Sequence, residues 1–418
     1  MIAPHTDAEP GPAPTAAGSS RALRWLLALY VVTAVLVGLQ RTLLSNENNF
    51  LIFRAAFEHL VSGENLYAAY SARHADLFKY SPTFALLFAP FAVLPVVPGY
   101  VLWALACALA VYAGLTRLLP ARQAALALAL AWLSVVGDLQ RAQSNALSAA
   151  LMILAWVAYE RRRQWGAAAA IAAGALIKIF PLAAVAGALF HPRKARFAAA
   201  FTVVLALGVA LPLLVTPPGS LAMQYRAWWA IETLDAGPTA RIGTGGADLY
   251  AGVMGLFQAW FGVTWPYWPT QLAGTLLLLL PAVLHYRRGG VDRSFRVRFA
   301  ASILVFCVLF NHQAESPSYA IAMIGAAIWF AASERAGWRT ALVAVCILIV
   351  NLGSSDLMPR PWYHQYYVPY LLKTVPLVPL WIAMQGELLG LIANRGPSER
   401  AEADEGEVAP AKSFPHPG

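Results

Sequence analysis

The polar stretch from Ser45 to Pro82, SNENNFLIFRAAFEHLVSGENLYAAYSARHADLFKYSP, interrupts a chain that is otherwise made of apolar runs. It follows the first of those runs directly, and it carries more carboxylates, amides, aromatic rings and cations than a connector needs. In a membrane protein such a stretch is a large loop on one side of the bilayer. Ionisable groups this close to hydrocarbon are functional candidates, so we expect chemistry in this loop.

The composition identifies a membrane protein. Of the 418 residues, 59% are hydrophobic and 12% are charged, and the mean hydropathy is +0.57; soluble domains carry about 25% charged residues. The net charge of +9 comes from short basic clusters between apolar runs. That pattern orients membrane spans and does not favour a nucleic-acid partner. The three cysteines lie in apolar segments without ligand spacing, so neither disulfides nor zinc is indicated.

The orientation of the chain follows from its basic residues, because cytoplasmic loops carry an excess of Lys and Arg. Arg21 and Arg24 begin the first apolar run, Ala22 to Leu44, which is long enough to cross the hydrocarbon core. The N-terminus is therefore predicted to be cytoplasmic, and the polar stretch is predicted to face outward. The segment Thr83 to Leu94 is short and bracketed by prolines, which favours a re-entrant or interfacial helix.

The same rule, followed to the end of the chain, predicts about twelve spans with both termini inside. We therefore expect an all-α polytopic protein of the cytoplasmic membrane. No internal repeat is evident, which disfavours a transporter built from duplicated halves. The predicted parts are a disordered cytoplasmic tail at 1–20, a membrane domain at 21–395 with outer loops at 45–98 and 216–268, and a second disordered cytoplasmic tail at 396–418.

One cation is predicted to lie inside the apolar layer. Lys178 stands in the sequence IKIFP, and basic clusters at 161–163 and 193–196 flank the segment on both sides. Both clusters are predicted to be cytoplasmic, so the intervening residues form a hairpin of two short helices with Lys178 near the outer half of the membrane. A lysine held there has little room to reach water, which favours a function.

The remaining polar residues differ between the predicted cytoplasmic loops and the predicted outer loops. The cytoplasmic loops carry Arg and Lys and almost nothing else that does chemistry, whereas the outer loops carry a mixture. The active surface is therefore predicted to face outward. Candidate residues on this side are Glu47, Asn48, Asn49, Arg54, Asp76 and Lys79 in the first loop, Arg141, Gln143 and Asn145 in the next, and Lys178, His312 and Glu315.

Several runs resemble glycosyltransferase family 87. They are NFLIFRAAFEHLVSGENLY at 49–67, KYSPTFALLFAPFAVLP at 79–95, LWALACALAVY at 102–112, QSNALSAALMILAW at 143–156 and ALIKIFPLAAV at 175–185. Members of that family read as an Asp-Phe start, a Gly-x-x-Leu-Tyr end, a Tyr-Pro-Pro step, a Gln-x-Asn helix start and a Lys-x-x-Pro element. The resemblance covers Leu26 to about Trp381.

The resemblance implies a GT-C membrane enzyme. Such an enzyme takes a sugar, often mannose, from a polyprenyl phosphate and transfers it on the outer face with inversion, while an outer carboxylate acts as the base. The implied partners are this donor, a lipid or glycan acceptor and membrane lipids; neither a cofactor nor a metal is expected. The alternative is a transporter or flippase of a lipid-linked sugar or another amphiphile, which needs the same polar cavity without a base.

The sequence departs from the family at Asn49, where the family start carries Asp. An amide does not accept a proton at neutral pH. Glu47 is the nearest carboxylate and is predicted to be the base, although it is also explained as the end of the first span in water. Asp76 is the second catalytic candidate, and Glu315 is a further one. Glu58 follows Arg54 by four residues, so a pair on a helix surface explains Glu58.

The other candidates are assigned to substrate binding. Lys79, Arg141 and Lys178 are the outer cations that suit a departing phosphate, although interfacial snorkelling explains the first two as well. Gln143 and Asn145 suit either a sugar or a helix cap. The substrate-binding prediction comprises Asn48, Asn49, Arg54, Lys79, Arg141, Gln143, Asn145, Lys178, His312 and Glu315.

Overall fold

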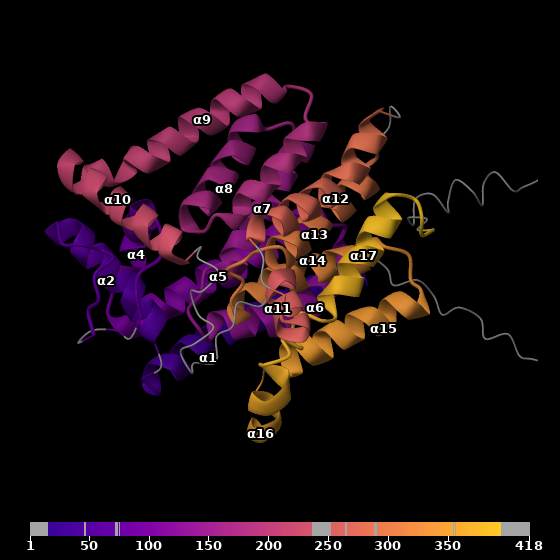
Figure 1. Cartoon of the computed structure of the whole chain (residues 1–418), viewed down its shortest axis with the longest axis horizontal. Helices are drawn as coiled ribbons and strands as arrows, with labels where there is room; N and C mark the ends of the chain where they lie inside the picture. The colour runs from indigo at the N-terminus through magenta and orange to yellow at the C-terminus, as the bar shows by residue number, and fades with distance from the viewer. Residues whose placement is uncertain are drawn as a thin grey trace, which may run out of the picture.

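The structure is a computed structural model that describes residues 16–45, 47–71, 74, 76–235, 252–263, 266–287, 291–353, 355 and 357–393. Within these ranges every regular element is a helix (Figure 1). The α-helices of the first half are α1 (Ala16–Leu43), α2 (Asn48–Ser62), α3 (Pro82–Leu87), α4 (Ala89–Ala92), α5 (Val96–Leu118), α6 (Ala121–Leu139), α7 (Asn145–Glu160), α8 (Gln164–Ile177) and α9 (Lys194–Ala210). Those of the second half are α10 (Pro218–Asp235), α11 (Val253–Phe261), α12 (Tyr267–Arg287), α13 (Arg293–Leu309), α14 (Tyr319–Ala332), α15 (Gly337–Cys346), α16 (Arg360–Trp362) and α17 (Leu377–Leu388).

Five shorter pieces complete the helices. The 3-10 helices are η1 (Phe180–Phe190), η2 (Leu211–Leu214) and η3 (Ser316–Ser318), and the π-helices are η4 (Ile347–Leu352) and η5 (Tyr363–Tyr367). Helix α7 lies in the middle of the bundle, packed against α5 on one side and against α8 and η1 on the other. Helix α9 packs on the outer side of α8.

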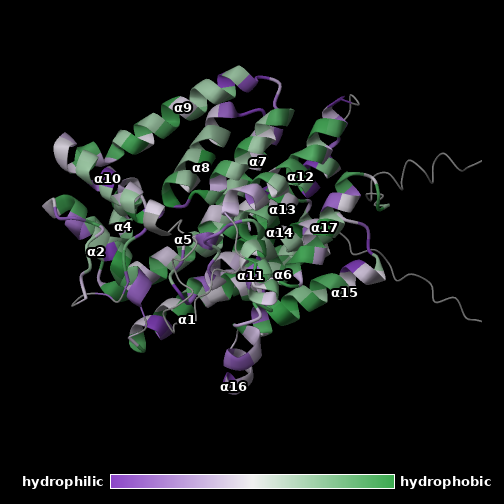
Figure 2. Cartoon of the chain, in the orientation of Figure 1, coloured by the Kyte–Doolittle hydropathy of each residue, from purple (hydrophilic) through white to green (hydrophobic). Residues whose placement is uncertain are grey.

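The surface of the bundle is apolar, as a lipid environment requires. In Figure 2 the outer helices α9 and α15 are largely hydrophobic along their length. Five helices of the described ranges are long and apolar enough to cross a membrane: Gly18–Leu43, Val96–Leu118, Ala121–Leu139, Lys194–Leu214 and Tyr267–Arg287. The predicted all-α polytopic membrane protein is confirmed, whereas the number of about twelve spans stays a prediction.

Several apolar helices are too short to span on their own. The predicted hairpin around Lys178 is present as α8 and η1, of 14 and 11 residues. The predicted interfacial segment after Ser81 is present as the short helices α3 and α4. Ser81 caps α3 through its side chain, which accepts from the Phe84 amide, and Pro82 occupies the first position of the helix. The prolines therefore set both the start and the brevity of this segment.

The predicted first outer loop is a folded element and not a connector. Helix α2 occupies its first half and ends at Gly63, whose φ of 77° is the left-handed conformation that closes many helices. Gln224 of α10 then joins the loop to the second outer region, because its side chain donates to Glu64 O at 2.7 Å and accepts from Leu66 N at 3.1 Å. The two predicted outer loops consequently form one body.

Aromatic packing fixes the inner face of this body. The Phe53 ring contacts the rings of Tyr80, Phe84 and Phe88 edge to face, with centroid distances of 4.9 to 5.3 Å. Edge-to-face pairs of buried rings add stability beyond their area. Trp103 of α5 also packs on the cluster, with its ring centroid 5.2 Å from that of Phe88. Tyr80 is thereby held rigidly beside the apolar hairpin.

Some predictions concern residues outside the described ranges. Most of the two predicted tails and part of the predicted outer loop at 216–268 lie there. The end of the predicted tail 1–20 is an exception, because α1 begins at Ala16.

Candidate active site

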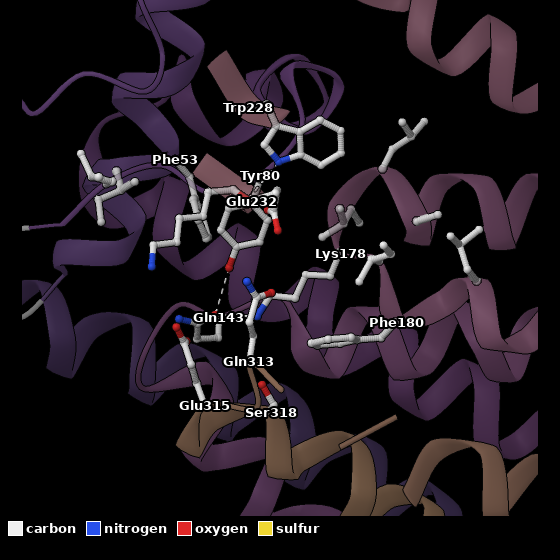
Figure 3. Close-up of a pocket in the computed structure, with 18 of the residues that line it drawn as sticks. Phe53, Tyr80, Gln143, Lys178, Phe180, Trp228, Glu232, Gln313, Glu315 and Ser318 are labelled. Atoms are coloured by element: carbon white, nitrogen blue, oxygen red, sulfur yellow. Dashed lines mark hydrogen bonds between the residues drawn. The ribbon is translucent and has the colours of Figure 1, made fainter. Parts of the chain in front are cut away.

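A cavity of about 390 Å³ opens beside the hairpin of α8 and η1, and we call it the main cavity. Its walls come from α2, the segment before α3, α8, η1, α9, α10 and the residues around η3. Figure 3 shows side chains from these distant parts of the chain converging around Lys178. The polar residues that line it are Asn49, Asp76, Lys79, Tyr80, Gln143, Lys178, Glu232, Gln313, Glu315 and Ser318.

The backbone breaks at Lys178. Helix α8 ends at Ile177, and Lys178 has an extended backbone conformation with its amide still bound to Gly174 O at 2.8 Å. The returning helix η1 then packs so closely that a Cβ on Gly174 would lie 2.6 Å from Pro181. Glycine at this position therefore allows η1 to fold back and leaves the Lys178 side chain at the tip of the hairpin.

The Lys178 ammonium is held by amide oxygens. Its Nζ donates to Asn145 Oδ1 at 2.9 Å and to Gln143 Oε1 at 3.4 Å. Asn145 is in turn oriented by Asp138, which accepts from Asn145 Nδ2 at 2.9 Å and from the Ala146 amide at 2.8 Å. Because a buried charge is tolerated when its hydrogen bonds are made, this chain of contacts explains how a lysine is kept in an apolar hairpin.

Tyr80 contacts both Lys178 and its partner Gln143. The phenol donates to Gln143 Oε1 at 3.0 Å, and the Lys178 Nζ lies 5.5 Å from the ring centroid. Burial raises the pKa of Tyr80 above its ordinary value, so the hydroxyl stays protonated and remains a donor. Gln143 therefore receives two donors on one oxygen, which fixes its orientation.

Three carboxylates line the main cavity, Asp76, Glu232 and Glu315. Asp76 is exposed, and its Oδ1 accepts from the Leu77 amide at 2.8 Å. In Figure 3 Glu315 lies on the side of Lys178 away from Phe180. Any carboxylate with a free lone pair can accept a proton from a hydroxyl within hydrogen-bond reach, so the cavity has more than one candidate base.

Asn49 also lines the main cavity, where the family would lead one to expect an acid. Its Nδ2 donates to Arg141 O at 2.7 Å, which joins α2 to the turn before α7. The amide oxygen is then left as an acceptor for a hydroxyl. A carboxylate could not make this contact, since it has no hydrogen to donate when ionised.

The opposite wall of the main cavity is apolar. It is formed by α8, η1, α9 and the neighbouring Trp228 and Trp229 of α10. Ile179 and Trp229 in this wall are 69% and 71% exposed, so the cavity continues onto the apolar outer surface of the protein. The apolar lining residues are Ile52, Phe53, Leu77, Ala175, Leu176, Ile177, Ile179, Phe180, Leu182, Leu205, Val209, Trp228 and Trp229.

The structure gathers about half of the predicted site residues. The six that line the main cavity are Asn49, Asp76, Lys79, Gln143, Lys178 and Glu315, and Asn145 contacts it through Lys178. Lys79 is joined to α10, because its carbonyl accepts from Trp228 Nε1 at 3.3 Å.

The other predicted residues do not line the main cavity; they are Glu47, Asn48, Arg54, Arg141 and His312. Arg54 pairs with Glu58 at 3.2 Å and donates to Leu94 O at 2.9 Å, so it joins α2 to the end of the interfacial segment. His312 stacks on Tyr267 with a centroid distance of 5.3 Å, and its Nδ1 lies 3.0 Å from Gln271 Nε2.

Five polar residues of this region were not predicted as site residues: Tyr80, Asp138, Glu232, Gln313 and Ser318. Asp138 lies in the last turn of α6 and is buried. Glu232 had a recoverable signal, since it follows Trp228 by four residues and a helix places both on one face.

A crystal structure of ArnT from Cupriavidus metallidurans bound to undecaprenyl phosphate is similar over 87% of this chain and 76% of that chain, with 14% sequence identity and a TM-score of 0.36. A TM-score this low leaves the assignment to the sequence match. No curated protein matches the chain.

The sequence matches glycosyltransferase family 87 over residues 78–311, which is more than half of the chain. The match includes Lys178 and the turns that carry Gln143 and Asn145, and it begins after the stretch that contains Asn49. The chain therefore belongs to glycosyltransferase family 87 and is a multi-pass membrane glycosyltransferase.

Proposed function

We propose that this enzyme transfers a hexose, with mannose as the first sugar to test, from a polyprenyl phosphate to a lipid or glycan acceptor at the outer face of the cytoplasmic membrane. The observation that carries the proposal is the amphipathic main cavity, in which one wall is polar and the other is apolar and continuous with the outer surface. A polyprenyl-phosphate sugar has the same division into a polar head and an apolar chain. We retain residues 21–395 as a single membrane domain.

Lys178 is the proposed phosphate-binding residue. It is the cation at the boundary between the two walls, and its ammonium is oriented by Asn145 and Gln143. An ammonium that is positioned before the reaction stabilises the charge that develops on a departing phosphate. Lys79, which also lines the main cavity, supplies a second positive charge.

Glu315 is the proposed general base. It lines the main cavity opposite the apolar wall, where an acceptor would approach a sugar whose phosphate is held by Lys178 (Figure 3). In the proposed step the acceptor oxygen bonds to the anomeric carbon, and the bond from that carbon to the phosphate oxygen breaks with its electron pair remaining on the phosphate. The acceptor proton passes to the Glu315 carboxylate, and the configuration inverts. Glu47, the base predicted from sequence, does not line the main cavity.

The experiment is reconstitution of the purified protein in liposomes with radiolabelled polyprenyl-phosphate mannose and an extract of membrane lipids as the acceptor source. We expect release of polyprenyl phosphate together with a labelled, inverted product. The same assay with the glucose and galactose analogues identifies the sugar. Transbilayer movement of the labelled lipid without release of polyprenyl phosphate would contradict the proposed donor and favour the transporter alternative.

A further inference from the structure

A second cavity, of about 180 Å³, lies at the far end of α7. No residue lines both this second cavity and the main cavity. The two meet α7 at opposite ends, and the helix is 16 residues long, so roughly 24 Å of helix separates them. The polar residues that line the second cavity are Trp156, Tyr159, Glu160, Arg162, His191 and Arg296.

Three buried polar atoms of the second cavity lack hydrogen-bond partners within the described ranges. Trp156 Nε1, Tyr159 OH and His191 Nε2 are all inaccessible to solvent, and none has a hydrogen-bond partner within the part of the chain that the structure describes. The side chains are 2%, 8% and 2% exposed. The rings are neighbours, since Tyr159 lies 6.0 Å from Trp156 and 6.0 Å from His191 between centroids. Buried polar groups are nearly always satisfied, so three together around one cavity point to a ligand.

All three atoms can serve as donors. An indole nitrogen only donates, and a phenol can donate. His191 Nδ1 accepts from the Arg193 amide at 3.2 Å, so the proton of the neutral ring lies on Nε2. Burial lowers the pKa of His191 below its ordinary value, which keeps the ring neutral. The complementary ligand is therefore rich in acceptor oxygens.

The charges of the second cavity favour an anion. Arg296 binds Glu160 through two hydrogen bonds, of 2.6 and 2.9 Å, and donates a third to Val291 O at 2.6 Å. A guanidinium has five N–H donors, so two remain. Arg162 adds a positive charge that Glu160 does not balance. Its φ of 55° is the left-handed conformation of the turn that closes α7.

We propose that the second cavity binds a phosphate-class anion, supplied either by the headgroup of an anionic lipid or as free phosphate. The volume is below the roughly 300–1,000 Å³ of pockets for drug-sized molecules, which suits a single phosphate group. The surrounding chain is strongly basic, with arginines at 161–163 and the run Arg193, Lys194 and Arg196. This end of α7 is the predicted cytoplasmic end, where anionic lipids are enriched.

The test measures phosphate binding in a background where the main cavity does not contribute. Purified protein carrying Lys178→Met is titrated with inorganic phosphate in a non-ionic detergent, and its thermal unfolding is followed by tryptophan fluorescence. Sodium chloride at the same ionic strength is the control for screening. We expect a saturable rise of the unfolding temperature with phosphate, because a ligand that binds the folded state stabilises it, and no such rise with chloride.

Two variants and one matched control locate the effect. Arg162→Gln removes a charge of the second cavity, whereas Arg161→Gln removes a neighbouring exposed charge that does not line it. We expect Arg162→Gln to weaken phosphate binding about tenfold, as the loss of one charge-assisted contact does, and Arg161→Gln to leave it unchanged. Tyr159→Phe is expected to raise the unfolding temperature without phosphate and to weaken phosphate binding, because it removes an unpaired buried hydroxyl.

The source of the phosphate is decided with nanodiscs. Protein in phosphatidylcholine discs is compared with protein in discs that contain phosphatidate, and retained lipid is counted by native mass spectrometry. Preferential retention of phosphatidate that Arg162→Gln abolishes supports the lipid source, and saturable binding of inorganic phosphate alone supports the free anion. The proposal is overturned if neither probe binds saturably, or if Arg161→Gln and Arg162→Gln weaken binding equally.

Discussion

The two ends of α7 differ in how their polar groups are satisfied. At the Asn145 end, the amide is held by Asp138 and in turn holds Lys178, so every member of the chain has a defined partner. At the Glu160 end, the Glu160–Arg296 pair is made, but the neighbouring Tyr159 hydroxyl and His191 Nε2 have no partner within the described ranges. The contacts that hold Lys178 are ordered without a ligand, whereas the Tyr159 hydroxyl and His191 Nε2 present donors to one.

This difference favours catalysis at the Asn145 end of α7 and ligand binding without catalysis at the Glu160 end. Catalysis benefits from groups that are fixed before the substrate arrives, because no reorganisation is then needed during the reaction. The contacts of Asn145 and Lys178 meet this condition. Unsatisfied donors such as those of Tyr159 and His191 favour binding, since a ligand removes the cost of their burial. Substitutions should therefore affect transfer at the first end and ligand binding at the second.

The largest effect is expected from the base. Glu315→Gln should lower the rate of sugar transfer by about 10²–10⁴-fold, because an amide does not accept the acceptor proton. The rate is measured as polyprenyl phosphate released by the reconstituted variant. Asp76→Asn and Glu232→Gln, which change the other carboxylates of the main cavity, are the matched controls and should have smaller effects. Near-normal transfer by Glu315→Gln would assign the base elsewhere.

Lys178→Met should come next, with a loss of about 10²–10³-fold in kcat, since methionine retains the apolar stem and removes the charge that stabilises the departing phosphate. Steady-state kinetics with increasing donor separate this from weaker binding. Lys79→Met changes a cation of the same cavity that lacks the Asn145 contact, and it should cost less. Equal losses of kcat for the two variants would contradict the proposal that Lys178 is the main phosphate-binding residue.

Asp138→Asn is expected to reduce kcat by about 10–100-fold, the range seen for residues that orient a ligand through a second side chain. The substituted amide keeps one acceptor oxygen, so it cannot accept from both Asn145 Nδ2 and the Ala146 amide as Asp138 does. The control is Ser134→Ala, which removes a buried hydrogen bond of the same helix, to Asn351 at 2.6 Å. If both variants lose activity in proportion to their unfolding temperatures, the role of Asp138 is stability alone.

The smallest effect concerns the hairpin itself. Gly174→Ala places a methyl group 2.6 Å from Pro181, and overpacking of this kind costs about 1–3 kcal/mol. We expect a lower unfolding temperature and reduced transfer, because η1 must move away from α8 and take Lys178 with it. Gly166→Ala lies on the same helix with ordinary contacts of 3.5 Å or more, and it should be neutral or stabilising. Thermal unfolding and transfer are measured on both proteins.

The sequence predicted the features that depend on charge and apolar length. Basic clusters on both sides of Lys178 were sufficient to predict the hairpin, because two short helices are the simplest path between two points on the same side. The all-α class and six of the main-cavity residues followed from similar signals, whereas the family followed from the resemblance of short sequence runs. These properties are local, and a single sequence contains them.

The missed residues depend on long-range contacts. Glu232 lines the main cavity because Gln224 joins α10 to Glu64 and Leu66, residues about 160 positions earlier in the chain. No periodicity reports such a pairing. Asp138 follows an apolar run, where a carboxylate usually ends a span. The structure instead keeps it in the last turn of α6 and satisfies the carboxylate with the start of α7.

The shortness of α7 and α8 makes the enzyme sensitive to bilayer thickness. At 16 and 14 residues they are roughly 24 and 21 Å long, against about 30 Å of hydrocarbon. In the predicted topology the basic cluster 161–163 lies at one interface, and the hairpin tip then stops short of the other. A thicker bilayer buries the tip further from water and from a polar acceptor, and a thinner one brings it toward the headgroups. We therefore expect lipid chain length to adjust access to the reacting atoms through hydrophobic mismatch.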